Sequence, residues 1–178
     1  KKKKPVVIVQ ISIGILTVIL VVLIIAMMMI VSSIQGTARI VNYAGLVRGK
    51  TQRIVKLEIS GKQEDDMIQE IESFIDGLMN GNKELNLVRL EDSDFQTKME
   101  ELNEYFLMLE QEIMQVRAYG ADKTQILSKS EHFFEICDEA TGLAEVYSQR
   151  KASSLSVLEK YITADIVVLI LLIGYEFI

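Results

Sequence analysis

Basic side chains are concentrated in one short segment of this 178-residue chain. Residues 39–56 contain five of them and no acid, and Glu58 is the first acidic residue of the sequence; the five are Arg39, Arg48, Lys50, Arg53 and Lys56. Guanidinium and ammonium groups bind anions through charge-assisted hydrogen bonds. The segment therefore predicts either a small anionic partner or ion pairs with acids of a neighbouring helix. Charge alone favours the ion pairs.

Spacing places one of these cations on a stripe of small and apolar residues. On a helix, positions three, four and seven apart share a face, and this relation joins Arg48 to Val41, Ala44, Gly45, Gln52 and Val55. A charge on such a stripe is costly unless it is paired. Gly45 and Gly49 stand four residues apart, a spacing that lets a second backbone approach closely and that is a stronger signal inside a membrane than outside it.

The same segment resembles a known family of sensor domains. Five residues match the pattern N-x-A-G-x-x-R-x-x-x-x-R, namely Asn42, Ala44, Gly45, Arg48 and Arg53. This pattern is typical of the first sensory helix of nitrate/nitrite sensor kinases and of the type IV pilus chemoreceptor, the PilJ/NarX-type sensor domain. The motif covers about a dozen residues, while the layout of span, helical bundle and span covers the whole chain.

The resemblance implies a homodimer that binds a small anion. In the family, this helix pairs with its copy, the Arg that matches Arg48 reaches across, and both copies hold one anion at the two-fold axis. We therefore expect a ligand site made by Asn42, Gly45, Arg48, Gln52 and Arg53. The resemblance makes nitrate and nitrite candidate ligands. Nitrate sensors usually carry R-M-x-S-x-R where this chain reads R-G-K-T-Q-R from residue 48, and this departure leaves the identity of the anion open.

Two apolar runs near the ends of the chain are expected to cross a membrane. Residues 6–31 form an uncharged run of 26 residues, which spans about 39 Å as a helix and exceeds a hydrocarbon core of about 30 Å. The run is too long for a secretory signal, and no A-x-A pattern follows it. Residues 162–178 form a second run, interrupted by Asp165 and Glu176, for which a buried core helix is the alternative. The chain starts with Lys and stops inside this run, so we interpret it as a fragment of a longer protein.

Charge sets the expected orientation. The four lysines that precede the first run predict a cytoplasmic N-terminus, because cytoplasmic flanks carry the Lys and Arg excess. The expected parts are a basic tip and first transmembrane helix at 1–32, an extracytoplasmic bundle at 33–161 and a second transmembrane helix at 162–178, in a bacterial plasma membrane. The middle part holds 15 basic and 23 acidic residues, a net charge of −8 that argues against nucleic acid as a partner.

Apolar periodicity between the two runs predicts helices only. Spacings of 4, 3, 4, 3, 4 and 3 residues make a seven-residue seam within 92–119, consisting of Phe95, Met99, Leu102, Phe106, Leu109, Ile113 and Val116. Shorter seams predict a helix over 64–79 (Met67, Ile71, Phe74, Leu78) and a last helix that starts near Asp122 or Lys123 (Phe133, Ile136, Ala140, Leu143, Tyr147). Asp92 or Ser93 is the expected cap of the third helix, Gly120 its stop, and residues 83–89 stay unassigned. The fold class is all-α, an antiparallel four-helix bundle flanked by two transmembrane helices.

Catalytic and metal chemistry lack candidate residues. Cys137 is the only cysteine and fits a small, semi-buried position, and His132 is the only histidine, with no Cys/His cluster near it. We expect no catalytic residue, no metal and no cofactor. The acidic residues fall away from the apolar seams and are interpreted as solvated surface. An enzyme is therefore the least favoured reading of this chain.

Three functional hypotheses follow from these observations. The first is a sensory module of a bacterial signalling receptor that binds a small anion at a dimer interface and passes a helix shift across the membrane. Its missing output domain is expected to be a histidine kinase, with a chemotaxis transducer or a diguanylate cyclase as alternatives. The second is a similar bundle that binds another small ligand, such as an amino acid or organic acid. The third is a ligand-free dimeric scaffold, which predicts that Arg48 pairs with an acid of its own chain, such as one on the last helix.

Overall fold

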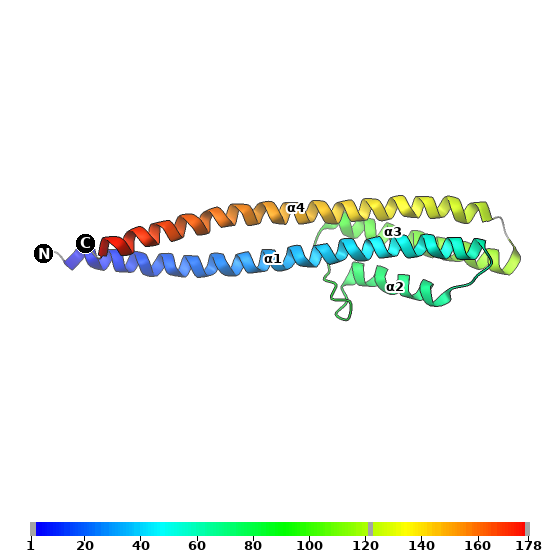
Figure 1. The fold of residues 1–178 in the computed structure, drawn as a ribbon, viewed down its shortest axis with the longest axis horizontal. Helices are drawn as coiled ribbons and strands as arrows, with labels where there is room; N and C mark the ends of the chain where they lie inside the picture. The colour runs from blue at the N-terminus through cyan, green and yellow to red at the C-terminus, as the bar shows by residue number, and fades with distance from the viewer. Residues whose placement is uncertain (1–2, 121–122, 177–178) are drawn as a thin grey trace. The chain divides into compact units, whose positions relative to one another are not determined.

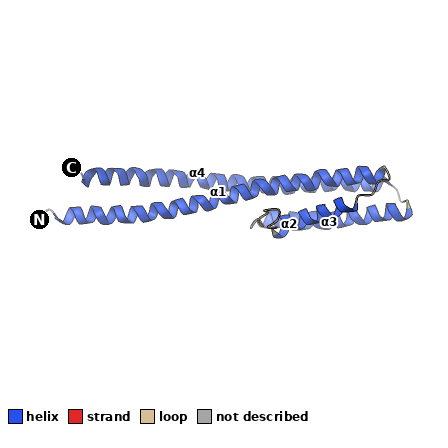
Figure 2. Ribbon diagram, turned by 60° about the horizontal axis from the view of Figure 1, so that its bottom comes forward, coloured by secondary structure: helices blue, strands red, loops and turns tan. Residues whose placement is uncertain are grey.

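The computed structural model describes residues 3–120 and 123–176, which form four helices and no strand (Figures 1 and 2). The helices are α1 (Lys3–Ile59), α2 (Asp65–Asn80), α3 (Ser93–Tyr119) and α4 (Lys123–Glu176). The expected all-α class is confirmed for this part of the chain. Asp122, the first two lysines of the basic tip and the last two residues of the second apolar run lie outside the described residues.

The chain divides into two compact units, which are described separately. Gln35–Ser148 form the bundle unit, which contains α2, α3 and the adjoining parts of α1 and α4. Lys1–Ile34 and Gln149–Ile178 form the terminal unit. The expected membrane boundaries at 32 and 161 stay predictions.

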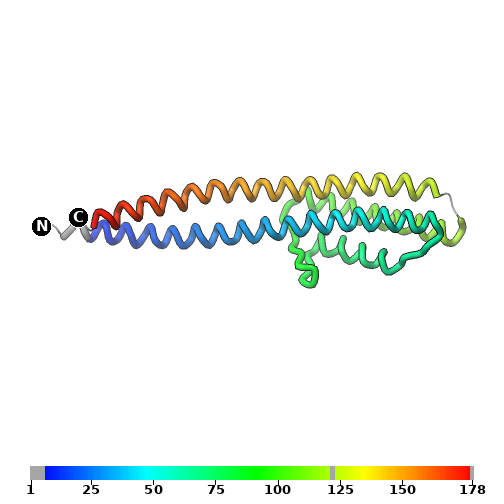
Figure 3. Tube along the Cα trace, in the orientation of Figure 1, coloured from blue at the N-terminus to red at the C-terminus, as the bar shows by residue number. Residues whose placement is uncertain are grey.

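The bundle unit has one hydrophobic core to which all four helices contribute. Successive helices run in opposite directions in it (Figure 3). The predicted seam of α3 is confirmed, because all seven of its side chains are buried. The seams of α2 and α4 also face the core: Ile71, Phe74, Leu78, Phe133, Ile136 and Ala140 are buried, and Met67, Leu143 and Tyr147 are partly buried.

The ends of α3 form by the local interactions that the sequence predicts. Asp92 is the N-cap, and its Oδ1 accepts a hydrogen bond from the Phe95 amide at 3.1 Å. At the other end, Gly120 takes the left-handed conformation with a φ of 64° and donates its amide to the Val116 carbonyl at 3.0 Å. Both caps are therefore made by residues within four positions of the helix ends.

The unassigned stretch at 83–89 belongs to a tight loop between α2 and α3. Asn82 and Leu87 exchange two backbone hydrogen bonds of 2.9 and 2.8 Å. Gly81 precedes this pair with a φ of 83°, and a Cβ there would approach the Arg89 amide nitrogen to 3.3 Å. Leu87 and Leu90 are buried in the core, so the loop is held by apolar contacts as well as by its backbone.

The terminal unit contains one candidate membrane span instead of the two expected. Among the described helices, α1 alone is long and apolar enough to cross a membrane, and the most apolar 18 residues within Val7–Ile59 have a mean hydropathy of 3.2. The C-terminal part of α4 is helical to Glu176 and exposes Ile170 and Leu171, yet its acids interrupt the apolar run. One of them, Asp165, is buried, and its Oδ2 has no hydrogen-bond partner among the described residues.

Candidate functional site

Arg48, the central residue of the predicted site, faces α4. Its Nη1 donates to Oδ1 of Asp138, and its guanidinium carbon lies 4.9 Å from the centre of the Phe134 ring. The side chains of Arg48 and Asp138 are 37% and 50% exposed, so water reaches both partners. Ion pairs this exposed contribute less than about 1 kcal/mol to stability. The charge on the small and apolar stripe is thus paired within its own chain.

Two other cations of the basic segment are also engaged within the bundle unit. Lys50 makes a 2.6 Å ion pair with Glu70 of α2, and its Nζ lies 5.9 Å from the centre of the Phe74 ring. Arg39 donates to the Asn86 carbonyl of the α2–α3 loop at 3.4 Å. The basic segment therefore serves three neighbours: Arg48 contacts α4, Lys50 contacts α2 and Arg39 contacts the loop.

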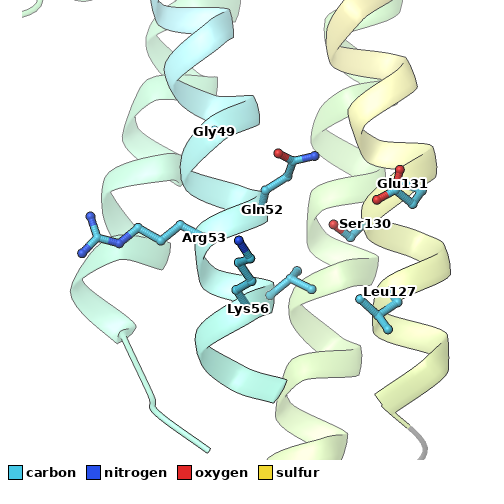
Figure 4. Close-up of a pocket in the computed structure, with 8 residues that line it drawn as sticks. Gly49, Gln52, Arg53, Lys56, Leu127, Ser130 and Glu131 are labelled. Atoms are coloured by element: carbon cyan, nitrogen blue, oxygen red, sulfur yellow. The ribbon is translucent and has the colours of Figure 1, made fainter. Parts of the chain in front are cut away.

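The remaining cations, Arg53 and Lys56, are exposed and form no ion pair within the described part of the chain. Both line a groove of about 460 Å³ between α1 and α4 (Figure 4). In this view Gln52 extends from α1 toward α4, whereas Arg53 points away from α4. The polar side chains that line the groove from α1 are Gln52, Arg53 and Lys56, and Gln52 is the one that extends toward α4.

The α4 side of the groove brings a hydroxyl, a carboxylate and an apolar side chain. Ser130 is 5% exposed and its oxygen lies on the side of α4 that faces α1 (Figure 4). Glu131 and Leu127 are exposed at the rim, and Val55 of α1 is buried beside them. The groove volume lies within the range of about 300–1,000 Å³ that small-molecule sites occupy. Its lining suits a small polar ligand that carries a negative group.

The structure distributes the five predicted site residues over two faces of α1. Arg48 and Gln52 are half-buried and face α4, Gly45 is half-buried, and Asn42 and Arg53 are exposed. The exposed positions of α1 recur at spacings of 3, 4, 3, 4 and 3 residues: Arg39, Asn42, Leu46, Gly49, Arg53 and Lys56. A Cβ built on Gly45 or Gly49 would meet nothing within 4 Å. This spacing places the six exposed positions along one face of α1.

Sequence reasoning did not identify the α4 residues of the site. Ser130, Glu131, Phe134 and Asp138 all lie at helical spacing along one side of α4, which the sequence alone does not assign to α1. A search for polar residues three and four positions apart could have found the polar ones among them. Most exposed helices carry such patterns, however, so the signal is not specific. The scaffold hypothesis did foresee the type of contact that Arg48 makes, namely an ion pair with an acid of the last helix.

Two nearby groups are buried in the bundle core. Cys137, the neighbour of Asp138, is fully buried, and burial raises the pKa of its thiol to about 12. A thiol in this state is protonated and unreactive, as the sequence indicated. Thr51 of α1 is 1% exposed, and its hydroxyl has no hydrogen-bond partner among the described residues.

The all-helical fold of this chain is similar to that of a solved protein domain. The ligand-binding domain of the P. aeruginosa nitrate receptor McpN is similar, with a TM-score of 0.56 and 18% sequence identity. The similarity covers 62% of this chain and 96% of that domain. No protein-family model matches the chain. The curated proteins contain no match either.

Proposed function

We propose that this chain is the ligand-sensing extracytoplasmic and transmembrane module of a bacterial signal-transduction receptor. The observation that carries the proposal is the fold that the chain shares with the ligand-binding domain of a nitrate receptor. A second observation supports it. Helix α1 contributes buried residues between Ile40 and Val55 to the bundle core, and the same helix is apolar enough to cross a membrane. The chain acts as a sensor and not as an enzyme.

The proposed ligand is a small anion held between two copies of the chain. Gly49 on the exposed stripe of α1 and the half-buried Gly45 both have open space beside their backbone, which supports close pairing with a second α1. Two guanidinium groups about 7 Å apart repel by about 2 kcal/mol at an effective dielectric constant near 20, and an anion between them reverses that sign. Asn42, Gly45, Gln52 and the arginines at 48 and 53 are the proposed site residues, and nitrate and nitrite are the candidate ligands.

The proposed signal is a small helix shift that passes through two membrane spans. The N-terminus is cytoplasmic in this proposal, residues 6–31 and 162–178 cross the membrane, and lipid surrounds both. Interfaces between helices commonly respond to ligands by shifts of about 1–2 Å. Both α1 and α4 contribute residues to the bundle unit and to the terminal unit, so each offers a continuous helical path for such a shift. A histidine kinase is the proposed output domain, with a chemotaxis transducer or diguanylate cyclase as alternatives.

Isothermal calorimetry with sodium nitrate on the detergent-solubilised chain tests the anion site. We expect Arg48→Ala to abolish binding and Arg53→Ala to weaken it, because each removes donors that fit a planar oxyanion. Lys62→Ala is the matched control, since it removes an exposed cation from the turn after α1. Circular dichroism must show unchanged helicity in all variants. Nitrate binding that persists undiminished in Arg48→Ala would remove Arg48 from the site.

A ligand-free dimeric scaffold is the second candidate function, and the Arg48–Asp138 ion pair favours it. In a scaffold the arginine serves only to hold α1 against α4. The two candidates differ in a thermal-shift screen with nitrate, nitrite, amino acids and organic acids. A receptor module gains melting temperature with one ligand class, because a ligand that binds the folded state stabilises it. A scaffold shows no shift with any of them.

A further inference from the structure

We propose that Asp138 is an internal counter-ion that an incoming ligand must displace from Arg48, and that it restricts the site to monovalent planar oxyanions. The inference rests on the proposed function and adds to it the regulation and the ligand class of the site. It assigns a role to a residue of α4 that the motif on α1 does not include.

The ion pair has the exposure of a contact that can be exchanged. The Arg48 side chain is 37% exposed, more than the paired side chains of Lys50 at 27% and Lys129 at 25%. The contrast is Arg117, which is 13% exposed and holds Glu58, a carboxylate that is 3% exposed. A ligand in solution reaches the guanidinium of Arg48 without opening the core.

The chemistry of Asp138 imitates that of the ligand. A carboxylate presents two oxygens in one plane, and nitrate presents the same arrangement of acceptors to a guanidinium. Asp138 accepts from Nη1 of Arg48 through Oδ1, so a bound oxyanion competes for the same donor. Phe134, four residues before Asp138, lies against the guanidinium and holds its place while the acceptor is exchanged.

Displacement leaves a carboxylate beside the bound ligand, which gives the site its selectivity. Asp138 is half exposed and stays at the same turn of α4 once it is released. Its negative charge repels a dianion more strongly than a monoanion. A monovalent ion such as nitrate is therefore preferred over a divalent ion such as sulfate.

The exchange also changes how α1 is tied to α4. The ion pair joins residues 90 positions apart in sequence, one on each of the two long helices. An anion on Arg48 removes this tie, and in a two-state receptor such a change biases the arrangement of the two helices. The ligand therefore replaces a contact within the chain by a contact with itself.

Calorimetry on the full chain with sodium nitrate and sodium sulfate tests the inference. We expect Asp138→Asn to bind nitrate about five- to tenfold more tightly than the unmodified chain, because both the competition and the repulsion are lost. We expect the same substitution to increase the affinity for sulfate by a larger factor than the affinity for nitrate. Glu139→Gln is the matched control: it removes the same charge from the next position of α4, where Glu139 pairs with Lys98, and it changes either affinity less than twofold.

Each outcome separates the inference from the function on which it rests. If the Asp138→Asn variant is less helical than the unmodified chain, the Asp138→Ala variant replaces it in the comparison. Nitrate binding that is lost in Arg48→Ala but equal in Asp138→Asn and Glu139→Gln overturns the role of Asp138 and leaves the anion sensor intact. If neither the unmodified chain nor Asp138→Asn binds nitrate or sulfate, the anion sensor itself fails.

Discussion

At the scale of single residues, the ion-pair partner of Arg48 lies on a helix that is far away in the sequence. The stripe of Ala44, Gly45 and Val55 around it predicted correctly that this charge needs a partner. The identity of the partner depends on how α1 and α4 are aligned along their lengths, and heptad spacing allows several alignments that differ by whole turns. Asp138, Phe134 and Ser130 therefore became recognisable only in three dimensions.

Cys137 yields a prediction about the pH dependence of stability. Its thiol is fully buried, and burial raises its pKa from 9.0 to about 12, an effect that Arg48 partly opposes and Asp138 reinforces. The folded state thus holds the proton more tightly than the unfolded state does. This contribution to stability is fully present below about pH 9 and is lost as pH rises toward 12.

Urea unfolding at pH 8 and pH 10 measures that contribution. We expect the unmodified chain to lose about 1 kcal/mol more than Cys137→Ala over this interval, because only the unmodified chain has a thiol to ionise on unfolding. Lysine and tyrosine titrations affect both proteins alike and cancel in the difference. An equal loss in the two proteins would contradict the burial of the thiol.

At the scale of elements, the predictable features were those with local causes. The α3 seam, its Asp92 cap and its Gly120 stop follow from spacing and from contacts within four residues. The loop between α2 and α3 was not predictable, because Leu87 and Leu90 fold onto a core that several helices build together. The groove between α1 and α4 was missed for the same reason.

Arg117 ties three elements together and carries a stability prediction. It donates to Glu58 near the end of α1, with Nε to Oε2 at 3.0 Å, and to Asp65 at the start of α2 at 2.5 Å. The hydrogen bonds to Glu58 raise the pKa of Arg117, so its guanidinium stays charged. Arg117→Ala leaves the Glu58 carboxylate buried without its partner, and we expect a loss of about 3–5 kcal/mol in urea unfolding.

The comparison variant for Arg117 is Lys98→Ala. Lys98 also pairs with two acids, Glu101 and Glu139, but these are 48% and 61% exposed. Its removal should lower the free energy of unfolding by less than about 1 kcal/mol, since exposed ion pairs contribute little. Similar losses in the two variants would mean that burial of Glu58 does not govern the strength of the Arg117 contacts.

At the scale of the whole molecule, the two apolar runs were read from length and composition, and they fared differently. The first run is the candidate span of α1. The second is helical but includes the buried Asp165, so composition alone does not make it a span. The helices and the core were predictable because the periodicity of apolar residues encodes them. Membrane topology also depends on the lipid bilayer, which is not part of the chain.

The proposed orientation is tested by labelling in intact bacteria. In a Cys137→Ala background, Lys62→Cys places one thiol in the exposed turn after α1. We expect a membrane-impermeant maleimide to label it in intact cells, because this turn is extracytoplasmic in the proposed topology. The unmodified chain is the control, since its buried Cys137 reacts only after denaturation. Labelling that requires permeabilised cells would reverse the proposed orientation.

The glycines at 45 and 49 have a consequence for engineering. Each lies within the helix α1, and each has open space where a methyl group would go. Alanine is favoured over glycine inside a helix by about 1 kcal/mol, so each glycine lowers the stability of the isolated chain. Gly45→Ala and Gly49→Ala together should therefore raise its thermal stability. If a second copy of the chain requires the absence of side chains at these positions, the doubly substituted chain will be more stable as a monomer but less active as a receptor.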